Sequence, residues 1–470
     1  NYSMKRRSFL KQAGATSLAF TIVPSFVLGK QHTAPSDLLY ISCFGVGGRG
    51  EGVIQELEAT TKVRIVSLCD VDRNRAMNTI NAYPNAHYYE DFRDVYDKHL
   101  NEIDAIMVAT PDHTHACISL PFIRAKKHAY VEKPLTHNIY EARLMAKTAQ
   151  KEQIVTQMGN QGVSDGGSKI IKGWIDKGDI GKVTTIDCWT NRPVWPQGFS
   201  NLPKEAEVPE TLNWDQWLGP SAYRPYSPAY LPFKWRSYWD FGTGALGDMG
   251  CHIIETPFNA LDLGYPLSAE SSNTEFWIDD FKRAENSITF PASSKVQMKF
   301  EIDDDVVNLN WYDGGILPNH PEGLDLNERL GASGGGTIIY GEKGIIIADV
   351  YSRNPRLFLK KKKNGTPTLI REKESKTIAS KSHALDFVEA CIDGGTTKSD
   401  FTSGGKLTEI VLMGNLAIYN SQQQQKGWDE SPPRKLKWDG KNMRVINRPD
   451  LDHIIRGSYR DGWKLDTNYE

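Results

Sequence analysis

The chain is poor in the features that mark several classes of protein. Its 470 residues include only six cysteines, and no two of them form a C-x-x-C pair. The cysteines therefore predict no zinc site, and their spacing demands no disulfide. The 56 basic and 58 acidic residues nearly cancel, which gives a formal net charge of −2. Because no excess of positive charge is present, we expect no nucleic-acid partner.

Long apolar runs are also scarce, and one at residues 13–28 is short and interrupted by Gly14 and Pro24. Such a run is less typical of a permanent membrane span than of a secretory leader. It follows Lys5-Arg6-Arg7-Ser8-Phe9-Leu10-Lys11, which resembles a twin-arginine export signal. We therefore expect residues 1–30 to be a signal and the protein to be periplasmic. The alternative is a chance basic start to a cytoplasmic protein.

The first half of the chain alternates between two kinds of segment, as an α/β protein does. Strands are predicted at 38–44, 63–69, 105–109, 129–132 and 154–158, and helices at 51–59, 73–82, 91–99, 115–125 and 139–151. This alternation predicts a doubly wound parallel sheet over residues 37–160. Such a sheet binds ligands at the carboxyl ends of its strands.

The pattern changes near Gly162. A helix at 168–177 and a strand at 183–190 are followed by a loop rich in proline and tryptophan at 192–235. A helix at 248–263 and strands at 273–278, 294–302, 306–311, 337–340 and 344–350 come next. This order predicts an α+β domain over 161–380, with a mostly antiparallel, open-faced sheet. Two late helices, at 382–393 and 406–421 within residues 381–470, are expected to pack back on the domain junction.

A glycine-rich turn, Gly45-Val46-Gly47-Gly48-Arg49-Gly50, joins the first predicted strand to a helix. This is the context that a dinucleotide fingerprint requires. Gly45 allows the tight turn, Gly47 lets the backbone approach a pyrophosphate, and Gly50 lets the helix pack close to the strand. The helix N-terminus then offers amide donors to the phosphates. The alternative is a similar turn in an unrelated α/β fold.

Asp70 supports the cofactor interpretation, because it ends the second predicted strand 20 residues beyond Gly50. An acidic group there accepts hydrogen bonds from ribose hydroxyls and repels a 2′-phosphate, which favours NAD over NADP. Arg73 and Arg75 follow closely and make this preference less sharp.

Two further motifs follow predicted strands: Thr110-Pro111-Asp112-His113-Thr114-His115 and Glu132-Lys133-Pro134. With the glycine-rich turn, they resemble the glucose–fructose oxidoreductase/inositol dehydrogenase/rhizopine catabolism (Gfo/Idh/MocA) family over about residues 37–350. Tail segments Trp428-Asp429 and 459–463 look like a secreted bacterial branch of that family.

The resemblance implies that Lys133 lies beside the nicotinamide and the substrate hydroxyl, where a cation can stabilise a developing alkoxide. It also places the turn with His113 and His115 against the cofactor. We interpret both histidines as lining or capping groups rather than metal ligands, since no third ligand completes a set. The predicted cofactor-binding residues are Gly45, Gly47, Gly48, Arg49, Gly50, Asp70, Thr110, Pro111, His113, His115, Glu132, Lys133, Asn160 and Gln161.

A second glycine-rich segment, at 242–252, contains Asp248 and His252. Four residues apart on a helix, they share a face, and a carboxylate there would favour the imidazolium. Such a pair can take a proton from a sugar hydroxyl. The family motif matches both residues and implies that His252 is the general base, while the role of Glu255 stays open. The alternative is a helix-capping Asp and a packed His.

Candidate substrate residues are Arg192 and Trp195, after a predicted strand, and Tyr238 and Trp239, before the glycine segment. Arginine can bind hydroxyl groups, and tryptophan can stack on a sugar ring. The alternative for these aromatic residues is a buried domain interface.

These observations together predict an NAD-dependent oxidoreductase with a tightly bound cofactor, acting on a secondary hydroxyl of a sugar, polyol or glycoside. One alternative is an NAD-dependent glycoside hydrolase or lyase that uses transient oxidation, elimination and re-reduction. Another is a non-catalytic sugar-binding protein. By resemblance alone we expect a homo-oligomer.

Overall fold

The computed structural model describes residues 37–465 apart from 285, 376–380 and 424–431. The predicted signal at 1–30 and the Trp428-Asp429 segment lie outside the described residues. Residues from Leu39 onward form one compact unit. All six cysteines are free thiols. None of the helices within the described residues is both long enough and apolar enough to cross a membrane.

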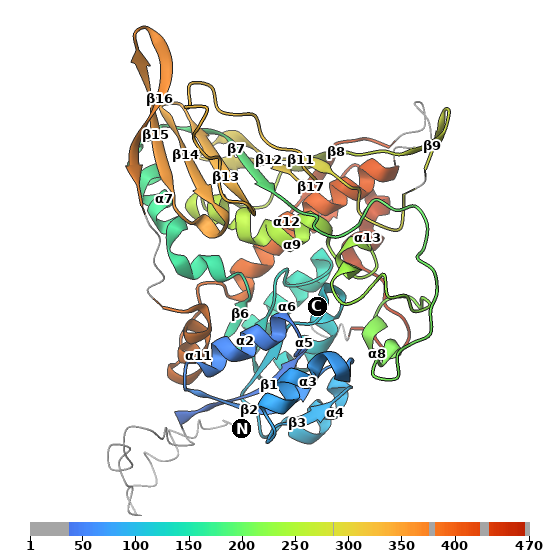
Figure 1. The fold of residues 1–470 in the computed structure, drawn as a ribbon. Helices are drawn as coiled ribbons and strands as arrows, with labels where there is room; N and C mark the ends of the chain where they lie inside the picture. The colour runs from blue at the N-terminus through green and yellow to red at the C-terminus, as the bar shows by residue number, and fades with distance from the viewer. Residues whose placement is uncertain (1–36, 285, 376–380, 424–431, 466–470) are drawn as a thin grey trace, which may run out of the picture. The chain divides into compact units, whose positions relative to one another are not determined.

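The first half of this unit is a six-stranded parallel sheet with the order β3-β2-β1-β4-β5-β6 (Figure 1). Its strands are β1 (Leu39–Phe44), β2 (Val63–Cys69), β3 (His87–Tyr89), β4 (Ala105–Val108), β5 (His128–Val131) and β6 (Thr156–Met158). Apolar runs such as β4 are buried on both faces, as parallel strands covered by helices are. The strand order reverses between β1 and β4, which places the ligand crevice there. The predicted doubly wound fold is confirmed.

The connecting helices begin where polar side chains cap them. They are α2 (Arg49–Glu58), α3 (Arg73–Ala82), α4 (Phe92–His99), α5 (His115–Arg124) and α6 (Ile139–Glu152). The carboxylates of Asp72 and Asp91 accept backbone N–H groups at the starts of α3 and α4, and Asn138 with Glu141 forms a capping box on α6. By contrast, Gly48 precedes α2 with no side-chain cap, so the first amides of α2 stay available.

The second sheet has ten strands in the order β16-β15-β14-β13-β7-β12-β11-β8-β17-β18. The long strands are β7 (Val183–Thr190), β11 (Ser294–Ile302), β12 (Asp305–Tyr312), β13 (Gly335–Gly341), β14 (Gly344–Asp349), β15 (Arg356–Lys363) and β16 (Thr366–Glu374), and the short ones β8 (Ser268–Asn273), β17 (Leu436–Asp439) and β18 (Arg444–Val445). Only the β7–β12 pair is parallel among these described neighbours. The predicted mostly antiparallel sheet is confirmed.

Two predicted elements of this half differ from the structure. The strand expected at 273–278 is wrong: β8 ends at Asn273, where its pairing with β11 also ends. Beyond it, β9 (Trp277–Asp279) and β10 (Lys282–Arg283) form a separate exposed hairpin. The β15–β16 hairpin was not predicted, since its run of four lysines at 360–363 lacks the apolar alternation of a half-buried strand.

The helix expected at 248–263 is in fact two helices, α9 (Gly244–Ile253) and α10 (Glu255–Ala260). Every residue of α9 is buried, so its limits cannot be read from one apolar stripe. Also present are α7 (Gly167–Asp176), α8 (Trp214–Leu218) and α13 (Asp452–Arg456).

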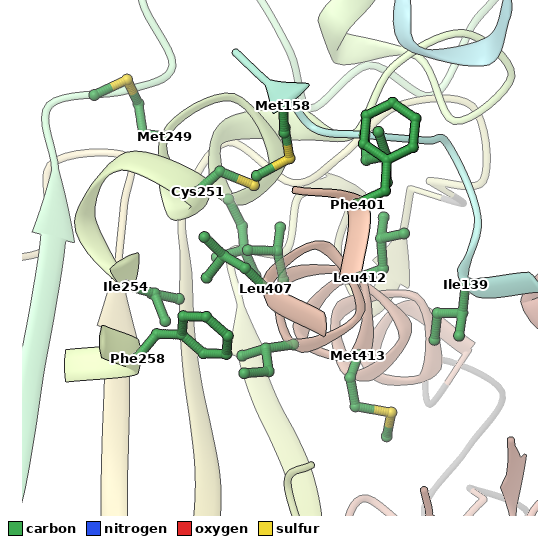
Figure 2. Close-up of a cluster of buried hydrophobic side chains, with 14 of the residues drawn as sticks. Ile139, Met158, Met249, Cys251, Ile254, Phe258, Phe401, Leu407, Leu412 and Met413 are labelled. Atoms are coloured by element: carbon green, nitrogen blue, oxygen red, sulfur yellow. The ribbon is translucent and has the colours of Figure 1, made fainter. Parts of the chain in front are cut away.

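The late helices are α11 (His383–Asp393) and α12 (Phe401–Gln422), and α12 connects the two sheets. α11 packs on α2 and β1, whereas α12 packs on α6, α9, β8 and β11. Figure 2 shows Leu407, Leu412 and Met413 of α12 clustered with Cys251 and Ile254 near α9, and with Met158 of β6. A Cβ at Gly414 would lie 2.5 Å from the side chain of Leu246, so glycine allows α12 this close approach to α9. This packing fixes α9 opposite the edge of the parallel sheet.

Candidate active site

A cavity of about 560 Å³ opens at the carboxyl edge of the parallel sheet. Its wall combines the glycine-rich turn, the ends of β4 and β5, α9, the loop after β7 and an aromatic segment. Thirteen of the predicted site residues line it: Gly45, Gly47, Gly48, Arg49, Asp70, Thr110, Pro111, Glu132, Lys133, Gln161, Arg192, Asp248 and His252.

The glycine-rich turn has the close contacts that its motif predicts. Gly45 has a φ of 72°, and a Cβ there would lie 2.8 Å from the carbonyl of Ala109. A Cβ at Gly50 would lie only 1.7 Å from the carbonyl oxygen of Gly45. Only glycine fits either position, because the turn packs against backbone. Gly50 therefore serves packing and does not line the cavity. The uncapped first turn of α2 faces the cavity and fits a dinucleotide pyrophosphate.

The carboxylate of Asp70 is hydrogen-bonded to the glycine-rich turn. Its Oδ2 accepts hydrogen bonds from the backbone N–H groups of Val46 (2.8 Å) and Gly47 (3.2 Å), and its Oδ1 accepts one from Asp72 (3.0 Å). Burial raises the pKa of Asp70, although these donors oppose the shift. Asp70 thus orders the turn, in addition to lining the cavity where the ribose is expected.

Glu132 and Arg49 form a second polar group on the wall. Glu132 Oε1 accepts hydrogen bonds from Arg49 Nε (3.0 Å) and Gln161 Nε2 (3.2 Å). A Cβ at Gly159 would lie 2.6 Å from the Glu132 carboxyl carbon, so this backbone closely supports the carboxylate. The three side chains hold one another against the cavity between the glycine-rich turn and β5.

Asp248 is the centre of the charged cluster on α9. Its carboxylate contacts Lys133 Nζ (3.0 Å) and Arg236 Nε (3.1 Å) through Oδ1, and Arg192 Nε (3.3 Å) through Oδ2. Burial alone would raise the pKa of Asp248, but Lys133, Arg236 and Arg192 outweigh it and hold that pKa well below the usual 3.8. The carboxylate is therefore ionised.

His252 lies one helical turn beyond Asp248 and lines the same cavity. Burial, reinforced by the charge of Lys133, lowers its pKa well below 6.5, although Asp248 opposes this shift. Asp248 therefore favours the imidazolium, as the sequence predicts, but burial and Lys133 outweigh its effect on the pKa of His252. His252 Nδ1 is buried and has no hydrogen-bond partner among the described residues. A neutral imidazole in this position can accept a proton.

Three residues predicted to bind the cofactor, His113, His115 and Asn160, do not line the cavity. They form hydrogen bonds with other parts of the protein instead. The ring nitrogens of His113 lie 3.2 and 3.0 Å from the carbonyl oxygens of Phe241 and Trp217, and burial lowers its pKa to about 3. His115 bridges the carbonyls of Thr110 and Pro134. Asn160 is bonded to Ser399. These side chains lock the turn after β4 and the end of β6.

Three predicted substrate aromatics are likewise packed away from the cavity. Trp195 donates to Gln197 Oε1 and packs edge-on against Phe233. Tyr238 belongs to a buried aromatic cluster, and Trp239 stacks near Phe290. Trp195 and Tyr238 are buried and Trp239 is partly buried, and none of the three lines the cavity.

The structure adds side chains to the wall that the sequence did not reveal. Phe233, Trp235 and Arg236 come from the segment around the short helix η6 (Lys234–Ser237), and Trp217 from α8. Tyr351, in η7 (Val350–Ser352), meets the ring of His252 edge-on at 4.8 Å between centroids. The abundance of tryptophan in 192–235 was the only signal in the sequence for this wall.

Glu255 lies behind the site. Its Oε2 accepts a hydrogen bond from Ser352 at 2.9 Å, and Asn259 bonds its other oxygen. Burial raises the pKa of Glu255. It joins α10 to the segment that carries Tyr351, so its place is structural. Within the described part of the chain, no group of three or more His, Cys, Asp or Glu side chains could hold a metal ion.

The family comparisons agree with this geometry. Residues 40–160 match the family model described as an oxidoreductase family with an NAD-binding Rossmann fold, and residues 167–270 match its C-terminal α/β domain. The chain belongs to the Gfo/Idh/MocA oxidoreductase family. Its parallel-sheet half is an NAD-binding domain.

Curated relatives match about three tenths of the chain. Inositol 2-dehydrogenase of Salmonella typhimurium is 26% identical over 141 residues, covering 29% of this chain and 41% of that protein. Glycosyl hydrolase family 109 protein 2 of Shewanella sp. strain ANA-3 is 30% identical over 170 residues, covering 32% and 37%. The matches thus span about two fifths of the relatives' length.

Solved structures share the fold over most of their length. Levoglucosan dehydrogenase, in complex with NADH and levoglucosan, has a TM-score of 0.56 at 17% identity, over 83% of this chain and 98% of that one. A UDP-N-acetylglucosamine 3-dehydrogenase from Acidithiobacillus ferrooxidans has a TM-score of 0.51 at 15% identity, over 82% and 99%.

Proposed function

We propose that the protein oxidises a secondary hydroxyl of a carbohydrate with NAD that stays bound between turnovers. The observation that carries this proposal is the meeting of Lys133, an ionised Asp248 and a neutral His252 on one cavity wall next to the glycine-rich turn. The relatives that act on inositol and the solved sugar dehydrogenases support a carbohydrate substrate.

Lys133 has donors for two tasks. Its ammonium group carries three N–H bonds, and Asp248 takes two of them through its backbone oxygen (2.7 Å) and Oδ1 (3.0 Å). The third is left for the oxygen of a substrate hydroxyl, on which negative charge develops as the proton leaves.

His252 is the proton acceptor. Because its imidazole is neutral and on the cavity wall, it can take the hydroxyl proton, and ionised Asp248 nearby stabilises the resulting cation. NAD, when bound, supplies the two-electron redox chemistry at the carbon that bears the hydroxyl. The residues present fit NAD through the glycine-rich turn, the amides of α2 and Asp70.

A strap of chain supports retention of the cofactor. Residues 211–217 cross the carboxyl end of β2: Arg73 N–H donates to Thr211 at 3.0 Å, and Asn213 N–H donates to Val71 at 2.8 Å. Trp217 from this strap and Trp463 from the tail line the same cavity as Asp70. Release of the adenosine end therefore requires these contacts to open.

The test is to denature the purified protein, identify any released nucleotide, and then assay a glycoside panel. We expect stoichiometric NAD or NADH, together with a keto-sugar product that accumulates when an electron acceptor is supplied. Protein that carries no nucleotide and forms no keto product with added NAD would contradict the proposal.

A second candidate, net glycoside cleavage with no net redox change, is favoured by the enclosed cofactor site and by the family 109 relatives. Transient oxidation acidifies a neighbouring C–H bond, elimination follows, and water addition with re-reduction restores the sugar. A free monosaccharide with an unchanged NAD redox state would select this candidate over the first.

We also propose that the chain is exported in folded form and assembles as a homo-oligomer. The Lys5–Lys11 segment supports export, and an NAD-loaded fold suits a twin-arginine route. Cell fractionation and light scattering of the purified protein test the two points separately. A cytoplasmic or a monomeric protein would contradict the corresponding one.

A further inference from the structure

The reacting end of the cavity holds more positive than negative charge. Lys133, Arg192 and Arg236 all contact the single carboxylate of Asp248, and their side chains are only 14%, 26% and 19% exposed. One further carboxylate on this wall, Asp112, is buried and accepts a hydrogen bond from Thr243. Glu132 also lines this wall but is paired with Arg49 at 3.0 Å, so that pair adds no net charge. The remaining three cations against two carboxylates leave one positive charge uncompensated, which favours an anionic ligand.

Arg192 and Arg236 both contact Asp248 in addition to Lys133, which lies 3.0 Å from it. Each arginine offers only its Nε to Asp248. Their Nη1 atoms bond to Asn191 Oδ1 (2.6 Å) and to the carbonyl of Phe233 (3.3 Å). Among the described residues neither Nη2 atom has a partner, so both keep free donors at the cavity.

Both guanidinium groups are held in place before any ligand arrives. Arg236 lies over the rings of Phe233 and Trp235, with 4.2 Å from its guanidinium carbon to each centroid. The backbone of Arg192 is fixed by Thr190 Oγ1 (3.3 Å) and Gly314 N–H (2.7 Å). Rigid forks of this kind suit an oxyanion, because the donor geometry is set in advance.

We infer that the substrate is an acidic carbohydrate whose oxyanion group, such as the carboxylate of a uronate, is bound by Arg192 and Arg236. This inference rests on the proposed function for the carbohydrate part. The sugar ring has an apolar surface to contact, since Phe233 and Trp235 line the same cavity beside Arg236. A sulfate ester offers the same oxyanion chemistry, and the test below distinguishes a bound sulfate ester from a bound carboxylate.

The test measures binding to the NAD-loaded protein by tryptophan fluorescence, because Trp217 and Trp235 line the cavity. The probes are methyl glucuronide with methyl glucoside, methyl galacturonide with methyl galactoside, and glucose 6-sulfate with glucose. The acidic member of at least one pair should bind roughly tenfold more tightly or better, as charge-assisted hydrogen bonds usually give. The acidic sugar that binds more tightly than its neutral partner identifies the oxyanion.

The binding assay decides the inference, whereas product analysis decides the proposed function. If no acidic sugar binds more tightly than its neutral partner, the inference is wrong, even where neutral glycosides are oxidised. If an acidic sugar binds selectively but gives no keto product, the inference stands and the proposed oxidation fails.

Variants separate ligand binding from the positioning of Asp248. Arg192→Gln and Arg236→Gln should each reduce the acid-to-neutral affinity ratio about tenfold, whereas Arg236→Lys should keep part of it. The matched control is Arg224→Gln, since Arg224 pairs with Asp240 and does not line the cavity. Equal losses for acidic and neutral sugars, with an unchanged ratio, would show positioning alone and overturn the inference. Thermal melting and NAD content confirm that each variant is folded.

Discussion

Lys133 meets Asp248 twice: its Nζ donates to the carboxylate Oδ1 at 3.0 Å and to the backbone oxygen of the same residue at 2.7 Å. Lys133 follows β5 of the parallel sheet, and Asp248 lies in α9. The double contact therefore joins the NAD-binding half to the helix that carries His252. It sets the direction of the ammonium group, because two of its three N–H bonds have fixed acceptors.

Lys133→Met should abolish most of the turnover while the protein keeps its nucleotide. Loss of the cation that holds the substrate hydroxyl should lower kcat roughly 10²–10⁴-fold. The measurement is keto-product formation at saturating sugar, with NAD content determined in parallel. Lys126→Met is the control, since that side chain is 73% exposed and lies outside the cavity lining. Turnover within about threefold of wild type in Lys133→Met, a loss far smaller than that range, would refute the assigned role.

The pH dependence of activity should reflect the lowered pKa of His252. Burial and Lys133 stabilise the neutral imidazole, so the base stays unprotonated as the pH falls through 6.5. The acid limb of the kcat/KM profile should lie clearly below that value, because protonation of His252 is what ends activity. Asp248, with its pKa held below 3.8, stays ionised across this range. A limb at or above pH 6.5 would count against His252 as the base.

Two glycines in α2 should respond in opposite ways to alanine. Gly50→Ala places a Cβ 1.7 Å from the Gly45 carbonyl oxygen, so the turn must open and NAD should be lost. Gly52→Ala lies in the same helix, where its Cβ meets only Arg49 Nη1 at 3.5 Å. The second change should be neutral or stabilise the helix by about 0.5–1 kcal/mol. Nucleotide content and Tm of both variants check this; NAD retained by Gly50→Ala would contradict the packing argument.

The strap over the adenosine end can be loosened by removing a single backbone hydrogen bond. Arg73 is the first residue of α3, a position that accepts proline, and its N–H donates to Thr211. Arg73→Pro deletes that donor and should speed NAD release, measured by exchange with labelled NAD after dilution. Arg73→Ala keeps the N–H and is the control for loss of the side chain. Equal release rates in the two variants would show that this bond does not retain the cofactor.

Much of the fold could be predicted from local pattern. The spacing of Gly45, Gly47 and Gly50 between a strand and a helix required a Rossmann turn, because only glycine satisfies these contacts with the backbone. The alternation of apolar segments predicted the parallel sheet. By contrast, the β15–β16 hairpin escaped prediction, since only the short start of β15, with Leu357 and Phe358, is apolar and buried, while four exposed lysines follow and β16 is mostly exposed.

The sequence by itself also determined that Lys133 follows a strand of the NAD-binding sheet and that Asp248 and His252 share a helix. Only the tertiary structure decided how they are charged. Arg192 and Arg236 reach Asp248 from positions 56 and 12 residues away, which no local spacing predicts. Their convergence keeps Asp248 ionised, whereas burial and Lys133 keep His252 neutral. Desolvation and through-space charge depend on which segments meet in three dimensions, and it is these that set the chemistry of the site.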